Sequence, residues 1–386
     1  MIALLVKYGE ISLRKANRTF FEDMLLKNIR DSLSDKTLRV AKEQGRFIIE
    51  NLKGDLDIDT TISEIKHIFG LIGFSPCINT NDQSIENLCD IAVRYFLKDI
   101  KHSFRVLTKR SNKNYPLTSN EISAIVGEQI VKNLPDITVK MKNPHTTLHI
   151  ELRNNAYIYV NTIPGEGGLP YASQGKGVLL LSGGFDSPVA GYLAARRGIE
   201  IMPMYFHSPP FVSERAADKA RDLVKTLSKY TDRTELMIVP FTDIQLFLKE
   251  NVSPEKLTIF LKRAMIRIAD TVAVREKMQC IITGDSIGQV ASQTMHSLTA
   301  VNSAAVLPII RPLCTMDKQE ILNIAEKIGT YDISVRPFDD CCTLFVAKHP
   351  ENKPNTNVIE KLERKLMDRL MPLLEYAIEK IDINNT

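Results

Sequence analysis

The beginning of the chain consists of short segments with the spacing of strands or helices. Residues 2–8 alternate as a strand does, and apolar residues recur at helical spacing over 20–33. Two further strands are predicted within 37–52, on either side of a turn at Gly45, and a second helix is predicted at 58–69. This succession predicts a ferredoxin-like split βαβ fold.

A second pattern follows from residue 85 to residue 162. It predicts helices at 85–97 and 121–134, and strands at 104–107, 147–153 and 156–162. Both kinds of periodicity lapse over 164–177, where proline and glycine are frequent.

Beyond this gap, apolar runs alternate with helical patterns. Strands are predicted at 178–181, 200–206, 236–239 and 280–283, and helices from about 188, at 213–229 and at 257–276. Strands that alternate with helices predict a doubly wound parallel sheet, whose ligands bind at the carboxyl ends of the strands. Residues 358–381 form an amphipathic pattern, and we expect that helix to be kinked or split at Pro372.

The complete pattern predicts a multidomain α/β protein. We expect a ferredoxin-like domain at 1–56, a second α/β domain at 57–165, a linker at 166–177 and a doubly wound domain at 178–386.

Composition limits the class of protein. Of the 386 residues, 44% are apolar and 25% are charged, as in soluble globular proteins. No segment approaches the roughly 20 apolar residues of a membrane span, and the first residues lack a signal-peptide layout, so we expect a cytoplasmic protein without a membrane partner. The net charge of +4 does not by itself indicate a nucleic-acid partner. The six cysteines include no C-x-x-C pair, so neither a structural zinc site nor a disulfide framework is expected.

The strand at 178–181 runs directly into Ser-Gly-Gly-Phe-Asp-Ser at 182–187. Gly183 and Gly184 let the backbone approach a ligand, and the positive end of the next helix points at the turn, so we expect a phosphate site. The lysine of the G-x-x-x-x-G-K-[ST] loop is missing, and Asp186 occupies the turn. A tight turn without a ligand is the alternative. The sequence resembles the PP-loop of ATP pyrophosphatases, which implies that the loop holds the leaving pyrophosphate and that Asp186 helps to place Mg²⁺.

Three predicted strands are followed directly by glycine or polar residues. These residues are Ser182, then His207 after Phe206, and Gly284 with Asp285. Because the carboxyl ends of parallel strands meet at one edge of a sheet, we expect the three turns to converge on one crevice. His207 is either a general base or a packing histidine, and packing is favoured because the sequence identifies no partner for it.

Basic residues gather in two predicted loops of the first half of the chain. One loop follows the strand at 2–8, and the other, at 109–119, adds hydroxyls and an aromatic ring to its cations. Such a mixture suits a phosphate backbone, and a solvated loop is the alternative. The second loop resembles the basic-x-x-Lys-x-Tyr/Phe-Pro-x-x-Ser hallmark of THUMP domains, with Ser119 as the cap of the next helix, and the resemblance implies tRNA binding. The residues expected to bind tRNA are Arg14, Lys15, Arg18, Lys109, Arg110, Lys113 and Tyr115.

In their order along the chain, these motifs are similar to those of the ThiI family of tRNA sulfurtransferases. The similarity also includes Tyr-Gly-Glu-Ile-Ser-Leu at 8–13, Phe-His-Ser-Pro-Pro-Phe at 206–211, Gly-Asp-Ser-Ile-Gly-Gln at 284–289 and Asp-Cys-Cys-Thr at 340–343. It implies an enzyme that activates O4 of uridine 8 in tRNA with ATP, releases pyrophosphate, and forms 4-thiouridine with persulfide sulfur from a cysteine desulfurase. It implies ATP contacts at Leu180, Leu181, Ser182, Gly183, Gly184, Asp186, Ser187, Tyr205, Phe206, Lys262 or Arg263, Gly284 and Gln293.

The adjacent Cys341 and Cys342 are the candidate catalytic thiols, and Asp186 is the candidate catalytic aspartate of the PP-loop. The two cysteines follow two carboxylates, which oppose thiolate formation. Without the family resemblance, they would be interpreted as unreactive thiols of a loop. Some family members carry the persulfide on a rhodanese domain, for which this sequence leaves no room. Sulfur is then expected to pass through Cys341 or Cys342, with Cys341 favoured, or directly from the desulfurase to tRNA. A role in thiamine thiazole synthesis is not expected. The other cysteines lie in apolar runs and are expected in the core: Cys77, Cys89, Cys280 and Cys314.

Two other functions are compatible with the nucleotide motif. A PP-loop ligase that acts on a small molecule would not need the basic first half of the chain. A tRNA-binding protein without catalysis would use ATP only as a signal. Pyrophosphate exchange that depends on tRNA separates the three functions, and a homodimer is compatible with all of them.

Overall fold

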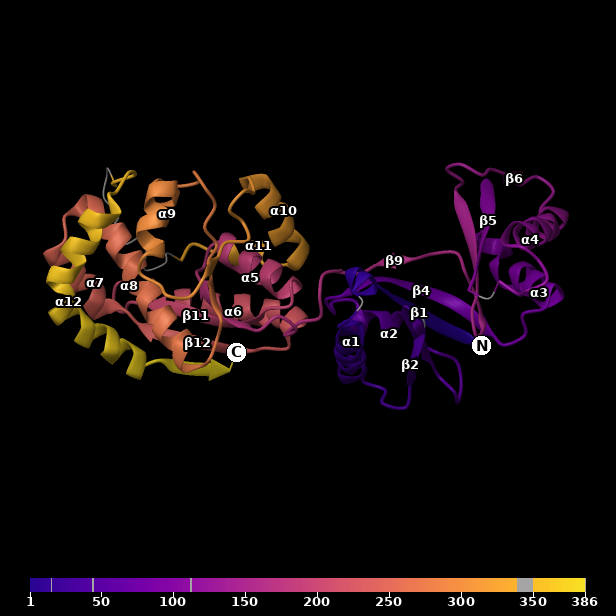
Figure 1. The fold of residues 1–386 in the computed structure, drawn as a ribbon, viewed down its shortest axis with the longest axis horizontal. Helices are drawn as coiled ribbons and strands as arrows, with labels where there is room; N and C mark the ends of the chain where they lie inside the picture. The colour runs from indigo at the N-terminus through magenta and orange to yellow at the C-terminus, as the bar shows by residue number, and fades with distance from the viewer. Residues whose placement is uncertain (15, 44, 112, 339–349, 386) are drawn as a thin grey trace. The chain divides into compact units, whose positions relative to one another are not determined.

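The computed structural model describes residues 1–14, 16–43, 45–111, 113–338 and 350–385 (Figure 1). These residues form two compact units, Met1–Leu169 and Pro170–Thr386. Among the described helices, none is long and apolar enough to cross a membrane.

The first unit begins with the predicted ferredoxin-like fold, which is confirmed. Its elements are β1 (Ile2–Tyr8), a 3₁₀ helix (Glu10–Leu13), α1 (Arg18–Ser32), β2 (Arg39–Glu43), β3 (Arg46–Glu50), α2 (Ile58–Ile65) and β4 (Leu71–Thr80). The strands pair antiparallel in the order β2-β3-β1-β4. Leu4 and Val6, which alternate along β1, are fully buried in one core with Phe21 of α1.

The first domain extends beyond the boundary that we predicted after residue 56. Ile62 and Ile65 of α2 belong to the same core as β1, and β4 pairs with β1 from Leu71 to Ile78. An amphipathic helix is stable only where its apolar face is covered, so α2 and the first part of β4 belong with the ferredoxin-like fold.

The long strand β4 also belongs to the second part of the unit, because its end pairs with a strand of that part. That part contains α3 (Ile85–Phe96), a 3₁₀ helix (Leu97–Asp99), β5 (Ser103–Arg110), α4 (Ser119–Asn133), β6 (Thr138–Val139), β7 (Thr146–Leu152), β8 (Ala156–Tyr159) and β9 (Ile163–Pro164). β8 pairs with the end of β4, with Ile158 opposite Ile78, so one nine-stranded sheet runs through the unit. Leu148 and Ile150 of β7 lie in one core with apolar residues of α3 and α4.

The segment that we predicted as a linker at 166–177 is divided between the two units. The Gly167 N–H donates to the Leu71 carbonyl in the first unit (2.7 Å). In the second unit, the Tyr171 hydroxyl accepts from the Ile201 N–H (3.2 Å). Most of the predicted linker is therefore tied to one folded unit or the other.

The second unit contains the predicted doubly wound sheet. Its strands are β10 (Lys176–Leu181), β11 (Glu200–His207), β12 (Glu235–Pro240), β13 (Cys280–Ile282), β14 (Ile309–Ile310) and β15 (Asp382–Asn385). They lie in the order β14-β13-β10-β11-β12-β15. Pairing is parallel except at β15, an unpredicted strand that runs antiparallel to β12. The chain leaves β10 toward β11 and later returns to its other side as β13, so the strand order reverses there and creates a crevice for ligands.

Helices form two groups around this sheet (Figure 1). One group comprises α5 (Asp186–Arg196), α6 (Glu214–Thr231), α10 (Lys318–Ile328) and α11 (Tyr331–Ser334). The other comprises α7 (Thr242–Asn251), α8 (Pro254–Arg275), α9 (Met295–Asn302) and α12 (Thr356–Glu379). α7, α9, α10 and α11 were not predicted, and α12 continues through Pro372 as one helix instead of splitting there.

Candidate functional site

The turn between β10 and α5 has the backbone of an anion-binding loop. The Ser182 N–H donates to Ser187 Oγ (2.8 Å), and the Gly184 N–H donates to Ser182 Oγ (3.3 Å), so the two serines brace the turn. α5 begins at Asp186, and its N-cap residue, Phe185, makes no side-chain hydrogen bond to the first turn. The first amides of α5 therefore remain available to an anion at the positive end of the helix.

Gly284, just beyond β13, lies against this turn. A Cβ at position 284 would stand 2.7 Å from backbone atoms of Asp186 and Ser187, which is closer than any side chain tolerates. Glycine is therefore required for the ends of β10 and β13 to approach each other.

A cavity of about 190 Å³ opens at this edge of the sheet. The residues predicted to contact ATP that line it are Leu180, Leu181, Ser182, Asp186, Ser187, Tyr205, Phe206, Lys262, Gly284 and Gln293. Gly183 and Gly184 lie in the turn itself. The lining also includes Met265, Ile266, Thr283, Asp285 and Val301, which were not predicted as ATP contacts. The first two follow Lys262 at helical spacing, so the period of α8 could have revealed them. A largely apolar wall with a few polar groups suits a nucleotide.

Asp186 brings a negative charge to the turn. Burial raises the pKa of its carboxyl group, a hydrogen bond with Gln289 and the Lys318 ammonium oppose this shift, and Asp285 adds to it. Lys318 is the first residue of α10 and was not predicted, because nothing in its local sequence marks it as part of the site.

Asp285 is the centre of a polar network on the cavity wall. Lys262 Nζ donates to its Oδ1 (3.0 Å), and both Arg311 Nε (3.2 Å) and the Thr283 hydroxyl (2.8 Å) donate to its Oδ2. Gln293 Nε2 lies 3.4 Å from Oδ1. Burial opposes ionisation of Asp285, but its cationic and hydroxyl partners outweigh burial and lower its pKa to about 2. The carboxylate is therefore charged at neutral pH and holds Lys262 at the cavity wall.

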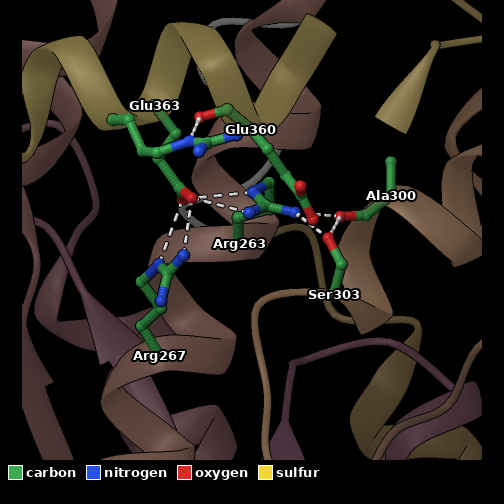
Figure 2. Close-up of polar contacts among 7 residues, drawn as sticks. Arg263, Arg267, Ala300, Ser303, Glu360 and Glu363 are labelled. Atoms are coloured by element: carbon green, nitrogen blue, oxygen red, sulfur yellow. Dashed lines mark hydrogen bonds and ion pairs between the residues drawn. The ribbon is translucent and has the colours of Figure 1, made fainter. Parts of the chain in front are cut away.

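Arg263 does not line the cavity, and its Nε, Nη1 and Nη2 all bond partners within the fold, so the structure does not support its predicted contact with ATP. Its side chain is fully buried and donates to both carboxylate oxygens of Glu363, from Nη2 (2.6 Å) and Nε (3.1 Å) (Figure 2). Nη1 donates to the Ala300 carbonyl and to Ser303 Oγ (2.7 Å). Adjacent residues of a helix point about 100° apart, so Lys262 and Arg263 cannot both face the nucleotide cavity.

Glu363 connects two arginines of α8 to α12. Besides Arg263, it accepts from Arg267 Nη2 (2.6 Å) and Nε (3.1 Å), as Figure 2 shows. Burial raises the pKa of Glu363, but the bonds from both arginines more than compensate and hold it below its usual value. This network, which we call the Glu363 cluster, joins α8, α9 and α12 behind the cavity.

His207 is bound within the fold. Its Nε2 lies 3.0 Å from Glu214 Oε1, its ring stacks on Tyr205, and the residue is 7% exposed. It is not among the residues that line the cavity. This environment agrees with a packing histidine.

In the first unit, Lys109 and Lys113 are exposed, as a contact with a phosphate backbone requires. Arg110 instead braces its own loop, because Nη1 donates to the carbonyls of Tyr115 (3.1 Å) and Leu117 (2.5 Å). Arg110 therefore holds the shape of the loop, and the contacts of Lys109 and Lys113 with tRNA phosphates stay predictions.

Tyr115 also has a structural environment. Its hydroxyl donates to the Gln83 carbonyl (2.5 Å), and its ring packs against the core of this part of the unit. The residue is still partly exposed, and its predicted contact with tRNA stays a prediction. The cap of α4 is Thr118 and not the predicted Ser119, since the Thr118 side chain accepts from the Glu121 N–H and the Glu121 carboxylate accepts in return.

The first basic loop is partly engaged inside its own domain. The Arg14 guanidinium lies 4.3 Å from the centre of the Phe21 ring, and Arg18 Nε donates to Glu22 (2.7 Å). Lys15 lies outside the described residues. The predicted tRNA contacts of this loop stay predictions.

The predicted catalytic thiols, Cys341 and Cys342, lie outside the described residues. Cys77 and Cys280 are buried as predicted, and burial raises the pKa of the Cys77 thiol to about 12. Cys314 is half-buried instead of belonging to the core, and so is Cys89. No group of three or more His, Cys, Asp or Glu side chains in the described part of the chain could hold a metal.

Three protein families match the chain. The family described as thiamine biosynthesis protein (ThiI) matches residues 172–367. The ThiI ferredoxin-like domain matches residues 3–75, and the THUMP domain matches residues 79–161.

Curated relatives are similar over nearly the whole chain. A probable tRNA sulfurtransferase of Agathobacter rectalis is 45% identical over 384 residues, which cover 98% of this chain and 97% of the relative. A probable tRNA sulfurtransferase of Lachnoclostridium phytofermentans is 45% identical over 385 residues, which cover 99% of this chain and 98% of the relative.

Solved structures share the fold. The crystal structure of a 4-thiouridine synthetase–RNA complex with bound ATP has a TM-score of 0.88 and 36% identity, and the match covers 100% of this chain and 99% of that one. A protein from Pyrococcus horikoshii has a TM-score of 0.65 at 24% identity, covering 85% of this chain and 100% of its own.

Proposed function

This chain belongs to the ThiI family and is a tRNA sulfurtransferase, and we propose that it converts uridine 8 of tRNA to 4-thiouridine through an adenylated intermediate. The observation that carries this proposal is the cavity at the strand-order reversal, where the PP-loop, Lys262 and Asp285 meet. The cytoplasm, where tRNA is found, is the proposed place of the reaction.

The proposed chemistry has three steps. Uridine O4 attacks the α-phosphorus of ATP, and pyrophosphate leaves toward the PP-loop amides and Lys262. The terminal sulfur of a persulfide then attacks C4, and AMP leaves with the former O4. A second thiol finally attacks the S–S bond, so that the transferred sulfur stays on C4 and the carrier thiol and the second thiol leave as a disulfide. Adenylation is required because a carbonyl oxygen is a poor leaving group, whereas AMP is a good one.

Mg²⁺ fits this site as a partner of the nucleotide. Mg²⁺ binds through one or two carboxylates together with substrate phosphates and does not need a cage of protein ligands. Asp186 is the carboxylate of the PP-loop, and its hydrogen bond with Gln289 fixes its orientation. When bound, the ion would offset charge on the departing pyrophosphate.

The proposed tRNA contacts can be tested by salt dependence. Replacing Lys109 and Lys113 together with alanine should weaken tRNA binding and reduce the slope of log K against log salt by about 1.4–1.8, since each lost phosphate contact accounts for about 0.7–0.9. Filter binding across a salt series measures this slope. A Lys53→Ala, Lys66→Ala variant, which removes two exposed lysines of the ferredoxin-like domain, is the control. A slope equal to that of the parent would show that the loop is only a solvated surface.

The proposed sulfur source is the persulfide of a cysteine desulfurase, and the proposed carrier is Cys341 or Cys342. Each cysteine should be replaced by serine separately and together, and pyrophosphate release and 4-thiouridine formation should be assayed with desulfurase and cysteine. We expect the single variant that removes the carrier, and the double variant, to release pyrophosphate normally but to form no thiouridine. Full thiouridine formation in the double variant would show that sulfur reaches tRNA without either thiol.

One assay tests the function as a whole. We expect ATP–pyrophosphate exchange that requires tRNA. Exchange without tRNA would favour a small-molecule ligase, and ATP binding without exchange would favour a nucleotide sensor. Mass spectrometry of tRNA from a deletion strain should show loss of 4-thiouridine.

A further inference from the structure

Arg311 lies at the carboxyl ends of the parallel strands, where the nucleotide cavity opens. It follows β14, which pairs parallel with β13, and β13 pairs parallel with β10. The position after β14 is therefore on the same side as Asp285 and the PP-loop. The Arg311 side chain is only 9% exposed, so its guanidinium is almost completely removed from water.

One donor nitrogen of this guanidinium has no acceptor in the described part of the chain. Arg311 Nε donates to Asp285 Oδ2, but Nη2 is buried without a hydrogen-bond partner among the described residues. Burying a donor of a cationic group without an acceptor is costly, so native proteins rarely do it without a reason. An anionic ligand would supply the acceptor.

Arg311 is separated from the cavity by a single carboxylate. Asp285 lines the cavity and binds Lys262 through Oδ1 and Arg311 through Oδ2. Two cations therefore share one carboxylate, and one positive charge is left uncompensated by Asp285. Such a surplus beside a PP-loop that lacks a lysine favours a phosphate group.

We propose that Arg311 is a further phosphate-binding residue of this site, which contacts the phosphate chain of ATP and the pyrophosphate released from it, as the adenylation proposed above requires. Asp285 is its positioning residue, because the bond to Nε orients the guanidinium plane and directs the remaining N–H groups. Arginine suits this role because its planar donors match phosphate oxygens in pairs.

Direct binding to the full-length protein tests this proposal. Isothermal titration with inorganic pyrophosphate, ATP and adenosine should be compared for the parent, Arg311→Gln and Arg311→Lys. We expect Arg311→Gln to weaken pyrophosphate and ATP binding by about 10- to 100-fold, the usual effect of losing a hydrogen bond to a charged group. Adenosine, which has no phosphate, should bind with unchanged affinity. Arg311→Lys keeps the charge and should recover part of the affinity.

Arg233→Gln is the matched control. Arg233 is also a poorly exposed arginine that bonds two carboxylates, Glu200 and Glu235, but it lies at the opposite edge of the sheet. This variant should bind all three probes as the parent does. Equal pyrophosphate affinity in Arg311→Gln and the parent, or an equal loss for adenosine and ATP, would overturn the proposal and leave Arg311 a structural partner of Asp285. If the parent binds pyrophosphate but fails to release it from ATP in the presence of tRNA, adenylation is wrong, whereas the same titrations still decide the role of Arg311.

Discussion

Asp186→Asn should abolish pyrophosphate release while it preserves the fold and the affinity for tRNA. The substitution hardly changes side-chain volume, but it removes the negative charge of the PP-loop, on which the proposed Mg²⁺ contact depends. Loss of one such electrostatic contact typically slows catalysis by about 10²- to 10³-fold. Pyrophosphate release in the presence of tRNA measures the effect, and thermal unfolding and tRNA binding test the fold.

Asp243→Asn provides the control for this substitution. Asp243 is an exposed acid in the first turn of α7, as Asp186 is an acid in the first turn of α5, and both helices belong to the same unit. Its replacement should leave pyrophosphate release unchanged. Normal release by Asp186→Asn would contradict the PP-loop assignment.

The same carboxylate should set the acid limit of the reaction. Burial raises the pKa of Asp186, so its charged form is lost at a higher pH than in an ordinary aspartate. Pyrophosphate release by the parent should therefore decline as the pH falls toward this raised pKa.

Glu363→Leu should be strongly destabilising, by about 3–5 kcal/mol, because it leaves the fully buried guanidinium of Arg263 without its carboxylate. The Glu363 cluster joins three helices, so its loss should also weaken packing behind the cavity. Urea unfolding followed by circular dichroism measures the free energy of unfolding.

Two variants show whether the buried charge causes this effect. Glu375→Leu removes an exposed glutamate from the same helix and should change the free energy of unfolding by at most about 0.5 kcal/mol. The double variant Arg263→Leu, Glu363→Leu removes both members of the fully buried pair and should recover much of the lost stability. A Glu363→Leu variant as stable as Glu375→Leu would show that the cluster contributes nothing to the fold.

The local sequence pattern was sufficient to predict a structural element wherever that element depends on a single segment of the chain. The buried run before Ser182 predicted β10, the Gly-Gly turn predicted a phosphate loop, and most helices follow from apolar spacing over three or more turns. In the second unit, α7, α9, α10, α11, β14 and β15 escaped prediction, because a helix of three turns or fewer and a short edge strand give only a short periodic signal. The boundary after residue 56 was placed too early because β4 serves two folds, and pairing between distant strands cannot be read from local sequence.

The sequence by itself determined the fold class, the PP-loop and most of the longer strands and helices, because these depend on periodicity and on residues that are adjacent in the chain. Only the tertiary structure decided which neighbour on α8 faces the cavity, because a rotation of about 100° separates a cavity residue, Lys262, from a buried one, Arg263. Only the tertiary structure joined Asp285 to Arg311 and brought Lys318 to Asp186. Such contacts form when parallel strands from distant segments place their carboxyl ends at one edge of a sheet, and no spacing along the chain records them.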